Sequence, residues 1–262
     1  MNYLEAFYDQ YDEDARLQTQ HGKVEYLTTR KIIRERLEGV SRPRILEIGA
    51  GTGRYSVTLA KEGLTVTAVE LLAHNLEILF SKLDGTEPIT VRQGNALDLS
   101  FLPDGSFDLT MLLGPMYHLF TKEEREKALS EAVRVTKPGG SILVSYCMNE
   151  PTVVQYVFGA DHLQEVLDAG LLTKDWHCKD EPSKVFALFR TEDIAALDAK
   201  FPVERIKLVA TDGATRYMSE VIDGLDEARF SKWMEYHFSI CERQDLVGAS
   251  HHTLDVLRKK KP

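Results

Sequence analysis

Short apolar runs alternate with amphipathic segments through the first half of the chain. The runs suit buried strands, because their apolar residues are consecutive and several are β-branched. They occupy residues 44–48, 65–69, 89–92, 107–113 and 141–146. Between these runs, apolar residues recur at helical spacing, and this predicts helices over residues 55–62, 73–83 and 122–136. Strands that alternate with helices indicate an α/β fold with a parallel, doubly wound sheet.

The segments on either side of this alternation are mostly helical. Before it, residues 23–37 keep a helical period, and Gly39 and Pro43 predict the end of that helix. No linker rich in Pro, Gly or Ser divides the chain, so we expect the second half to pack on the sheet of a single domain. Two late strands bring the predicted sheet to seven strands. In the second half, helices are predicted over residues 151–169, 191–199 and 226–243, and strands over 205–210 and 252–257.

Composition narrows the class of protein. Asp and Glu outnumber Lys and Arg by 41 to 32 among 262 residues, which gives a formal net charge of −9. This balance argues against binding of nucleic acid through an extended basic surface, although a local basic groove is compatible with it. The three cysteines are widely spaced, so neither a disulfide framework nor a metal site is predicted, and a reducing compartment is favoured. We find no signal-peptide pattern and no run long enough to span a bilayer, so we expect a cytoplasmic protein without a membrane partner.

A glycine-rich loop joins the first predicted strand to the next helix, with the sequence Glu47-Ile48-Gly49-Ala50-Gly51-Thr52-Gly53. Glycines permit a tight turn and a close ligand, and the helix N-terminus adds N–H donors. Nicotinamide dinucleotides bind a similar loop, but their Gly-x-Gly-x-x-Gly pattern has a glycine where this chain has Arg54. Glu47 would repel a pyrophosphate and attract an ammonium group. The alternative interpretation is a tight turn that binds nothing.

Two further features follow the next predicted strands. Glu70 ends the second strand, where a carboxylate can bind both hydroxyls of a ribose. The third strand is followed by Gly94-Asn95-Ala96-Leu97-Asp98, in which Asn95 can hydrogen-bond an adenine edge and Leu97 can pack on its ring. Alone, each feature also fits a surface charge or a turn. Their order and spacing together favour a nucleoside site.

In this order, the motifs resemble those of the class I S-adenosylmethionine-dependent methyltransferases. The resemblance includes the strand start Phe107-Asp108-Leu109 and an expected turn at Lys137-Pro138-Gly139-Gly140 before the fifth strand. It covers residues 44–149 well and the rest of the chain more loosely, and it is closest to the type 11 group of small-molecule enzymes. Asn95 departs from the pattern, since many relatives carry Asp there.

This resemblance implies a Rossmann-like fold, S-adenosylmethionine as cofactor and S-adenosylhomocysteine as product. In one domain of residues 1–262, residues 1–40 would form an N-terminal helical lid and 41–149 the cofactor-binding core. Residues 150–250 would form a helical cap insertion with a late core strand near 203–211, and 251–262 the closing strand. The residues expected to bind the cofactor are Glu47, Gly49, Gly51, Gly53, Glu70, Leu71, Asn95, Ala96, Leu97 and Leu113.

The acceptor is expected beyond the carboxyl end of the fourth strand, in the stretch Leu113-Gly114-Pro115-Met116-Tyr117-His118. By resemblance, the Leu113 carbonyl faces the methionine ammonium, and Tyr117 and His118 are the catalytic candidates. His118 is the candidate base for an acceptor that must lose a proton, with a structural role as its alternative, whereas the alternative for Tyr117 is to line the pocket. The expected substrate and lid residues are Tyr11, Met116, Arg30 and His251.

We therefore expect a methyltransferase that acts on an O, N or C atom of a small molecule. An RNA methyltransferase with a local basic surface and a non-catalytic S-adenosylmethionine-binding module are the alternatives. No Asn/Asp-Pro-Pro-Tyr/Phe motif and no Pro-Cys pair occurs, which argues against methylation of base amines and of cytosine C5. A nucleic-acid partner is therefore disfavoured, and the oligomeric state is open between monomer and homodimer.

Overall fold

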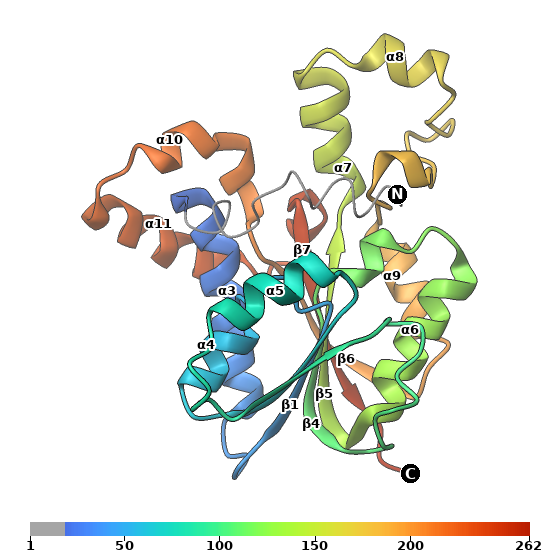
Figure 1. Cartoon of the computed structure of the whole chain (residues 1–262). Coiled ribbons are helices and arrows are strands. Elements are labelled where there is room, and N and C mark those ends of the chain that lie inside the picture. Colours follow the sequence, from blue (N-terminus) through green and yellow to red (C-terminus); the bar gives the residue numbers. More distant parts are fainter. Residues whose placement is uncertain (1–18) are drawn as a thin grey trace.

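The computed structural model describes residues 19–262 and contains a seven-stranded sheet in the order β3-β2-β1-β4-β5-β7-β6 (Figure 1). Neighbouring strands are parallel from β3 to β5, whereas β7 is antiparallel to both β5 and β6. This arrangement confirms the predicted doubly wound, mostly parallel sheet. The strands are β1 (Arg44–Ile48), β2 (Thr65–Glu70), β3 (Ile89–Gln93), β4 (Phe107–Leu112), β5 (Thr136–Cys147), β6 (Val203–Ala210) and β7 (His252–Lys259).

Helices cover both faces of the sheet (Figure 1). The main helices are α3 (Gln20–Leu37), α4 (Ser56–Lys61), α5 (Ala73–Ser81), α6 (Lys122–Val135), α7 (Asn149–Thr152), α8 (Leu163–Asp168), α9 (Thr191–Asp198), α10 (Ser219–Asp223) and α11 (Glu227–Ile240). A π-helical segment, η2 (Val153–Gly159), follows α7. Short 3-10 helices are η1 (Pro115–His118), η3 (Pro182–Lys184), η4 (Gly213–Met218) and η5 (Val247–Ala249). Within residues 19–262, no helix has the length and apolar character needed to cross a membrane.

Successive residues of each strand contribute to opposite faces, which explains the consecutive apolar runs. On β1, Ile45 packs in one core cluster with Ile32 of α3 and with α4. The next residue, Leu46, belongs to the cluster that contains Leu129 of α6 and Ile194 of α9. A strand covered on both faces must be apolar at almost every position, so Glu47 within β1 is an exception that needs a chemical reason.

The expected turn at Lys137-Pro138-Gly139-Gly140 is wrong, because β5 already begins at Thr136. Thr136 pairs with Phe107 of β4, and the register shifts before Ser141 pairs with Leu109. Gly139, with a φ of 81°, lies at this irregularity. A bulge accommodates proline and glycine inside a strand, and the sequence pattern alone does not distinguish it from a turn.

The single helix predicted for residues 151–169 is interrupted. The π-helical segment η2 ends at Gly159, and α8 begins only at Leu163. Between them Asp161 adopts a φ of 59°, in the left-handed region that ends a right-handed helix. The apolar spacing is helical on both sides of this break, so the periodicity did not reveal it.

One edge of the sheet collects the carboxyl ends of the parallel strands. Because β7 runs opposite to its neighbours, its first residue lies at the same edge as the last residues of β5 and β6. This topology brings together Gly49 after β1, Leu113 after β4, Cys147 of β5, Asp212 after β6 and His252 of β7. Ligands of open α/β sheets bind at this edge.

Candidate functional site

The glycine loop after β1 contains three glycines with positive φ, at 75° for Gly49, 54° for Gly51 and 82° for Gly53. A Cβ atom on Gly49 would lie 2.5 Å from Pro115 Cδ, and one on Gly53 would lie 2.7 Å from Leu79 Cγ. A Cβ atom on Gly51 would meet nothing within 4 Å. Gly49 and Gly53 are therefore required by packing, whereas Gly51 leaves room above the loop for a ligand.

Glu70, the last residue of β2, lies opposite this loop and is only 5% exposed. Its Oε2 accepts a hydrogen bond from the Gly51 N–H at 2.8 Å. Its Oε1 accepts hydrogen bonds from the Leu72 N–H at 2.9 Å and from the Asn75 amide at 3.2 Å. These donors fix the carboxylate between the glycine loop and the start of α5. Asn75 is a residue that the sequence analysis missed.

Glu47 is the buried acid within β1, with 1% of its surface exposed. Its Oε2 accepts a hydrogen bond from the Ser56 N–H at the start of α4, at 2.8 Å. Burial raises the pKa of Glu47 to about 8, against the effect of this hydrogen bond. The carboxyl group is therefore mostly protonated at pH 7, and a cation placed beside it would favour its ionised form.

These residues line a cavity of about 280 Å³, near the lower end of the volumes typical of small-molecule sites. The predicted residues that line it are Glu47, Gly49, Gly51, Glu70, Leu71, Asn95, Ala96, Leu97, Leu113, Tyr117 and His118. The lining residues that the sequence analysis did not select are Ala50, Thr52, Arg54, Tyr55, Leu72, Asn75, Gly94, Gly114, Pro115, Leu119 and Glu124. Most of the unselected residues are neighbours in sequence of the predicted ones, and this proximity was the only sign in the sequence that they line the cavity.

The turn after β3 forms one wall of the cavity. Asn95 Oδ1 accepts a hydrogen bond from the Leu97 N–H at 3.0 Å, so the Asn95 side chain stabilises its own turn. Gly94 lies against Val69, and a Cβ atom there would be 2.9 Å from Val69 Cγ1. The turn thus presents Ala96 and Leu97 to the cavity as an apolar surface suited to a flat ring.

The wall after β4 consists of Gly114 and the helix η1. The φ of 131° at Gly114 turns the chain, and Tyr117 and His118 then line the cavity. His118 Nδ1 lies 2.9 Å from the Val185 carbonyl oxygen, and the ring donates its proton to that oxygen. Burial lowers the pKa of His118 to about 4, so its imidazole is neutral at pH 7. The tautomer that donates from Nδ1 has Nε2 as its basic nitrogen.

Four predicted residues do not line this cavity. Gly53 packs on Leu79, and Met116 is completely buried in the core. The Arg30 guanidinium pairs with Glu62 and the Tyr26 hydroxyl. Arg30 does not line this cavity, and its charge is paired with that of Glu62.

The fourth of these residues, His251, is hydrogen-bonded to Gln155 and lies beside the ring of Tyr217. It does not line the cavity. Burial lowers its pKa to about 4. Tyr11, the predicted lid residue, lies outside the described residues.

Comparisons with known proteins point to one family. A family model described as a methyltransferase domain matches residues 45–140, the segment that carries the glycine loop, Glu70 and the β4 end. The chain is 36% identical over 105 residues to a demethylmenaquinone methyltransferase of Clavibacter sepedonicus, which is 40% of this chain and 41% of that protein. It is 25% identical over 166 residues to a ubiquinone biosynthesis O-methyltransferase of Alkalilimnicola ehrlichii, covering 63% of this chain and 65% of that protein.

A solved structure shares the fold over the whole length. It is a SAM-dependent methyltransferase from Thermotoga maritima, with a TM-score of 0.61 and 21% identity, and the match covers 99% of this chain and 100% of that one. By contrast, the sequence matches span less than two thirds of the two named relatives' own length. The family-model match, over residues 45–140, includes every residue that lines the cavity.

Proposed function

We propose that the chain is a class I S-adenosylmethionine-dependent methyltransferase and that it methylates a small-molecule acceptor. The family implies S-adenosylmethionine as cofactor. The observation that carries the proposal is the buried Glu70 carboxylate, fixed beside the open surface of Gly51 at the wall of the cavity. A buried carboxylate that faces a cavity is suited to bind the vicinal hydroxyls of a ribose.

The other walls fit the remaining parts of the cofactor. Ala96 and Leu97 would hold the adenine ring, and the Asn95 side chain would keep their turn in place. Glu47, with the Leu113 carbonyl nearby, would receive the methionine ammonium. A cation is the ligand part that suits a buried glutamate whose pKa is raised to about 8, because the cation offsets the cost of ionising that group.

When bound, S-adenosylmethionine supplies a methyl group on a sulfonium, which is electrophilic without further activation. The task of the chain is to align the acceptor with that methyl group and to exclude water, and alignment contributes about 7–11 kcal/mol in favourable cases. Tyr117 and His118 would shape the acceptor side of the cavity. For an acceptor that must lose a proton, His118 Nε2 would take it, because the Val185 carbonyl fixes the proton of the ring on Nδ1.

The charge of the chain supports a small acceptor. A formal net charge of −9 disfavours RNA, which is the substrate of the alternative activity. By their names, the relatives are a demethylmenaquinone methyltransferase and an O-methyltransferase of ubiquinone biosynthesis, so both names point to small-molecule acceptors. We further propose a cytoplasmic location, which the free state of all three cysteines supports.

A methyl-transfer screen tests this proposal. The full chain is incubated with isotopically labelled S-adenosylmethionine and either a small-molecule fraction or total RNA from a cell extract, and labelled products are identified by mass spectrometry. We expect a labelled small molecule and S-adenosylhomocysteine in equal amounts. Label in RNA alone would support the alternative enzyme, and binding of the cofactor without any product would support a binding module.

A further inference from the structure

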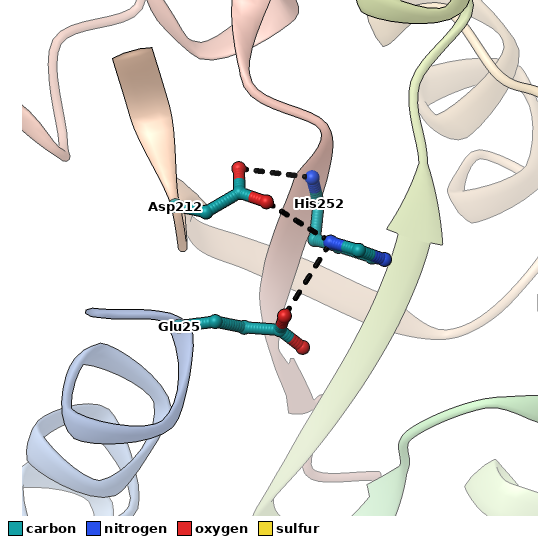
Figure 2. Close-up of side chains that lie close together, drawn as sticks. All are labelled: Glu25, Asp212 and His252. Atoms are coloured by element: carbon teal, nitrogen blue, oxygen red, sulfur yellow. Dashed lines mark hydrogen bonds and ion pairs between the residues drawn. The ribbon is translucent and has the colours of Figure 1, made fainter. Parts of the chain in front are cut away.

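A second cluster of charged side chains lies at the same edge of the sheet (Figure 2). The His252 Nδ1 atom is 3.0 Å from Asp212 Oδ2 and 3.5 Å from Glu25 Oε2. The three ligand atoms all lie within 4.8 Å of one another. Asp212 is 1% exposed at its side chain, Glu25 13% and His252 16%. Two carboxylates and one imidazole are therefore concentrated in a mostly buried space.

Three elements far apart in sequence hold this cluster. Glu25 comes from α3, Asp212 follows β6, and His252 begins β7 (Figure 2). The Thr211 N–H donates to the His252 carbonyl at 3.0 Å, which fixes the ends of β6 and β7 relative to each other. Because backbone pairing sets the positions of Asp212 and His252, their side chains converge in a rigid part of the fold.

A second layer of hydrogen bonds orients the cluster. The Ser250 hydroxyl lies 2.6 Å from Asp212 Oδ1 and donates to it, which leaves Oδ2 directed at His252. The Ser250 hydroxyl also accepts a hydrogen bond from the Gly213 N–H at 2.8 Å. Cys147 is opposite His252 in the β5–β7 pairing. Outer hydrogen bonds of this kind are typical of carboxylate and histidine ligands of metal ions.

The cluster brings two carboxylates to one imidazole. A divalent cation placed between them would interact with both carboxylates and leave the imidazole neutral.

We propose that Glu25, Asp212 and His252 bind a divalent transition-metal ion, Zn²⁺ or Mn²⁺. One nitrogen and two carboxylate oxygens form a donor set that both ions accept. Ligand atoms on one such ion lie roughly 3–4 Å apart, given bonds of about 2.1 Å. The distances from His252 Nδ1 to Asp212 Oδ2 (3.0 Å) and to Glu25 Oε2 (3.5 Å) fall in this range. The ligands have no short spacing in sequence, which explains why the sequence analysis predicted no metal.

The site lies beside the acceptor side of the cavity. The ring centroids of His252 and Tyr117 are 6.4 Å apart, and Tyr117 lines the cavity. Three protein ligands leave at least one position of the ion open to water or to an oxygen atom of a ligand. If the proposed function holds, on which this last step rests, the ion would favour acceptors that carry an oxygen donor.

Metal binding can be measured without cofactor or acceptor, so its outcome is independent of the proposed function. The chelator-treated full chain is titrated with Zn²⁺ and with Mn²⁺ by calorimetry, and Co²⁺ is followed by its visible absorption. We expect one site per chain. Glu25→Gln and Asp212→Asn should each weaken binding roughly tenfold or more, since each removes an anionic ligand.

Glu35→Gln is the matched control, because Glu35 is on the same helix and pairs instead with Lys207 and Lys31. Its metal affinity should equal that of the wild type. Thermal unfolding without metal checks that every variant is folded. Absence of binding at millimolar metal, or equal affinity in Glu25→Gln and Glu35→Gln, would overturn the proposal and leave the cluster as an ion pair between α3 and the sheet.

Discussion

Two buried glutamates on neighbouring strands differ in how the fold holds them. Glu70 accepts hydrogen bonds from the Gly51 and Leu72 N–H groups and from the Asn75 amide. Glu47 accepts one from the Ser56 N–H, and burial raises its pKa to about 8. At the residue scale, the proposed function therefore gives the two acids different partners: Glu70 would bind neutral hydroxyl groups and Glu47 a cation.

The raised pKa of Glu47 predicts that cofactor binding releases a proton at pH 7. Without ligand the carboxyl group is mostly protonated, and an ammonium beside it favours the ionised form. Calorimetry at pH 7 in two buffers of different ionisation enthalpy should give different heats for the wild type. The difference should shrink in Glu47→Gln. Equal heats in both buffers for the wild type would contradict this role.

The lowered pKa of His118 predicts the pH dependence of turnover. A base must be neutral to accept a proton, and with a pKa of about 4 the imidazole is neutral from pH 6 to pH 8. Turnover limited by His118 should therefore be flat over that range and fall only as the pH approaches 4. His118→Ala should lower kcat by about 10²–10⁴ with cofactor affinity unchanged. A limb centred near pH 6.5, or a nearly normal rate in the variant, would remove His118 as the base.

Individual site residues were predictable where a motif fixes the local backbone. The positions of Gly51, Glu70 and Leu97 followed from their places after predicted strands. Asn75 lies five residues after Glu70, so proximity in sequence was the only signal for it. Val185 was not predictable, because it reaches His118 through tertiary structure from 67 residues away, and no local pattern marks such a partner.

At the scale of elements, the glycine loop contains one glycine that the packing of the core requires and another that is proposed to make room for the cofactor. Gly53 faces Leu79 and Val57, whereas Gly51 faces open space at the cavity. The same residue type therefore has two roles within one loop. Sequence spacing predicted the loop but assigned both glycines to the cofactor.

Alanine substitutions should reveal these two roles. Gly53→Ala should lower the free energy of unfolding by roughly 2–4 kcal/mol, because overpacking adds to left-handed strain. Gly51→Ala introduces only the left-handed strain and should lower the free energy of unfolding by about 1–2 kcal/mol. It should nevertheless weaken cofactor binding more than Gly53→Ala does. Urea unfolding without ligand and calorimetry with S-adenosylhomocysteine measure the two effects. Equal losses of stability in both variants would contradict the assignment.

The order and type of most elements could be predicted because the strands are apolar runs bounded by glycine or proline. Helix and strand ends differed by a few residues, as for α5, which ends at Ser81 and not at residue 83. Larger errors arose where tertiary structure overrides local signals. The bulged start of β5 and the break before α8 are the two cases.

At the scale of the whole molecule, the antiparallel strand β7 determines which side chains from the second half of the chain reach the carboxyl edge of the sheet. It places His252 beside Cys147 of β5 and next to Asp212 after β6, at the edge where the cavity opens. Motif spacing could predict the cavity residues that follow β1 to β4, Tyr117 and His118 included. It could not predict that Glu25, Asp212 and His252 converge, because the strand order and the position of α3 are set by packing. The assignment of residues 1–40 as a lid and 150–250 as a cap stays a prediction.

The central claim is that the cavity beside Glu70 binds S-adenosylmethionine, and a calorimetric titration of the full chain tests it most directly. We predict that S-adenosylmethionine and S-adenosylhomocysteine bind and that NAD does not. Glu70→Ala should weaken binding at least tenfold, or about 1.4 kcal/mol or more. The exposed Glu77→Ala on α5 should leave it unchanged. Unchanged affinity in Glu70→Ala, or micromolar binding of NAD, would contradict the account.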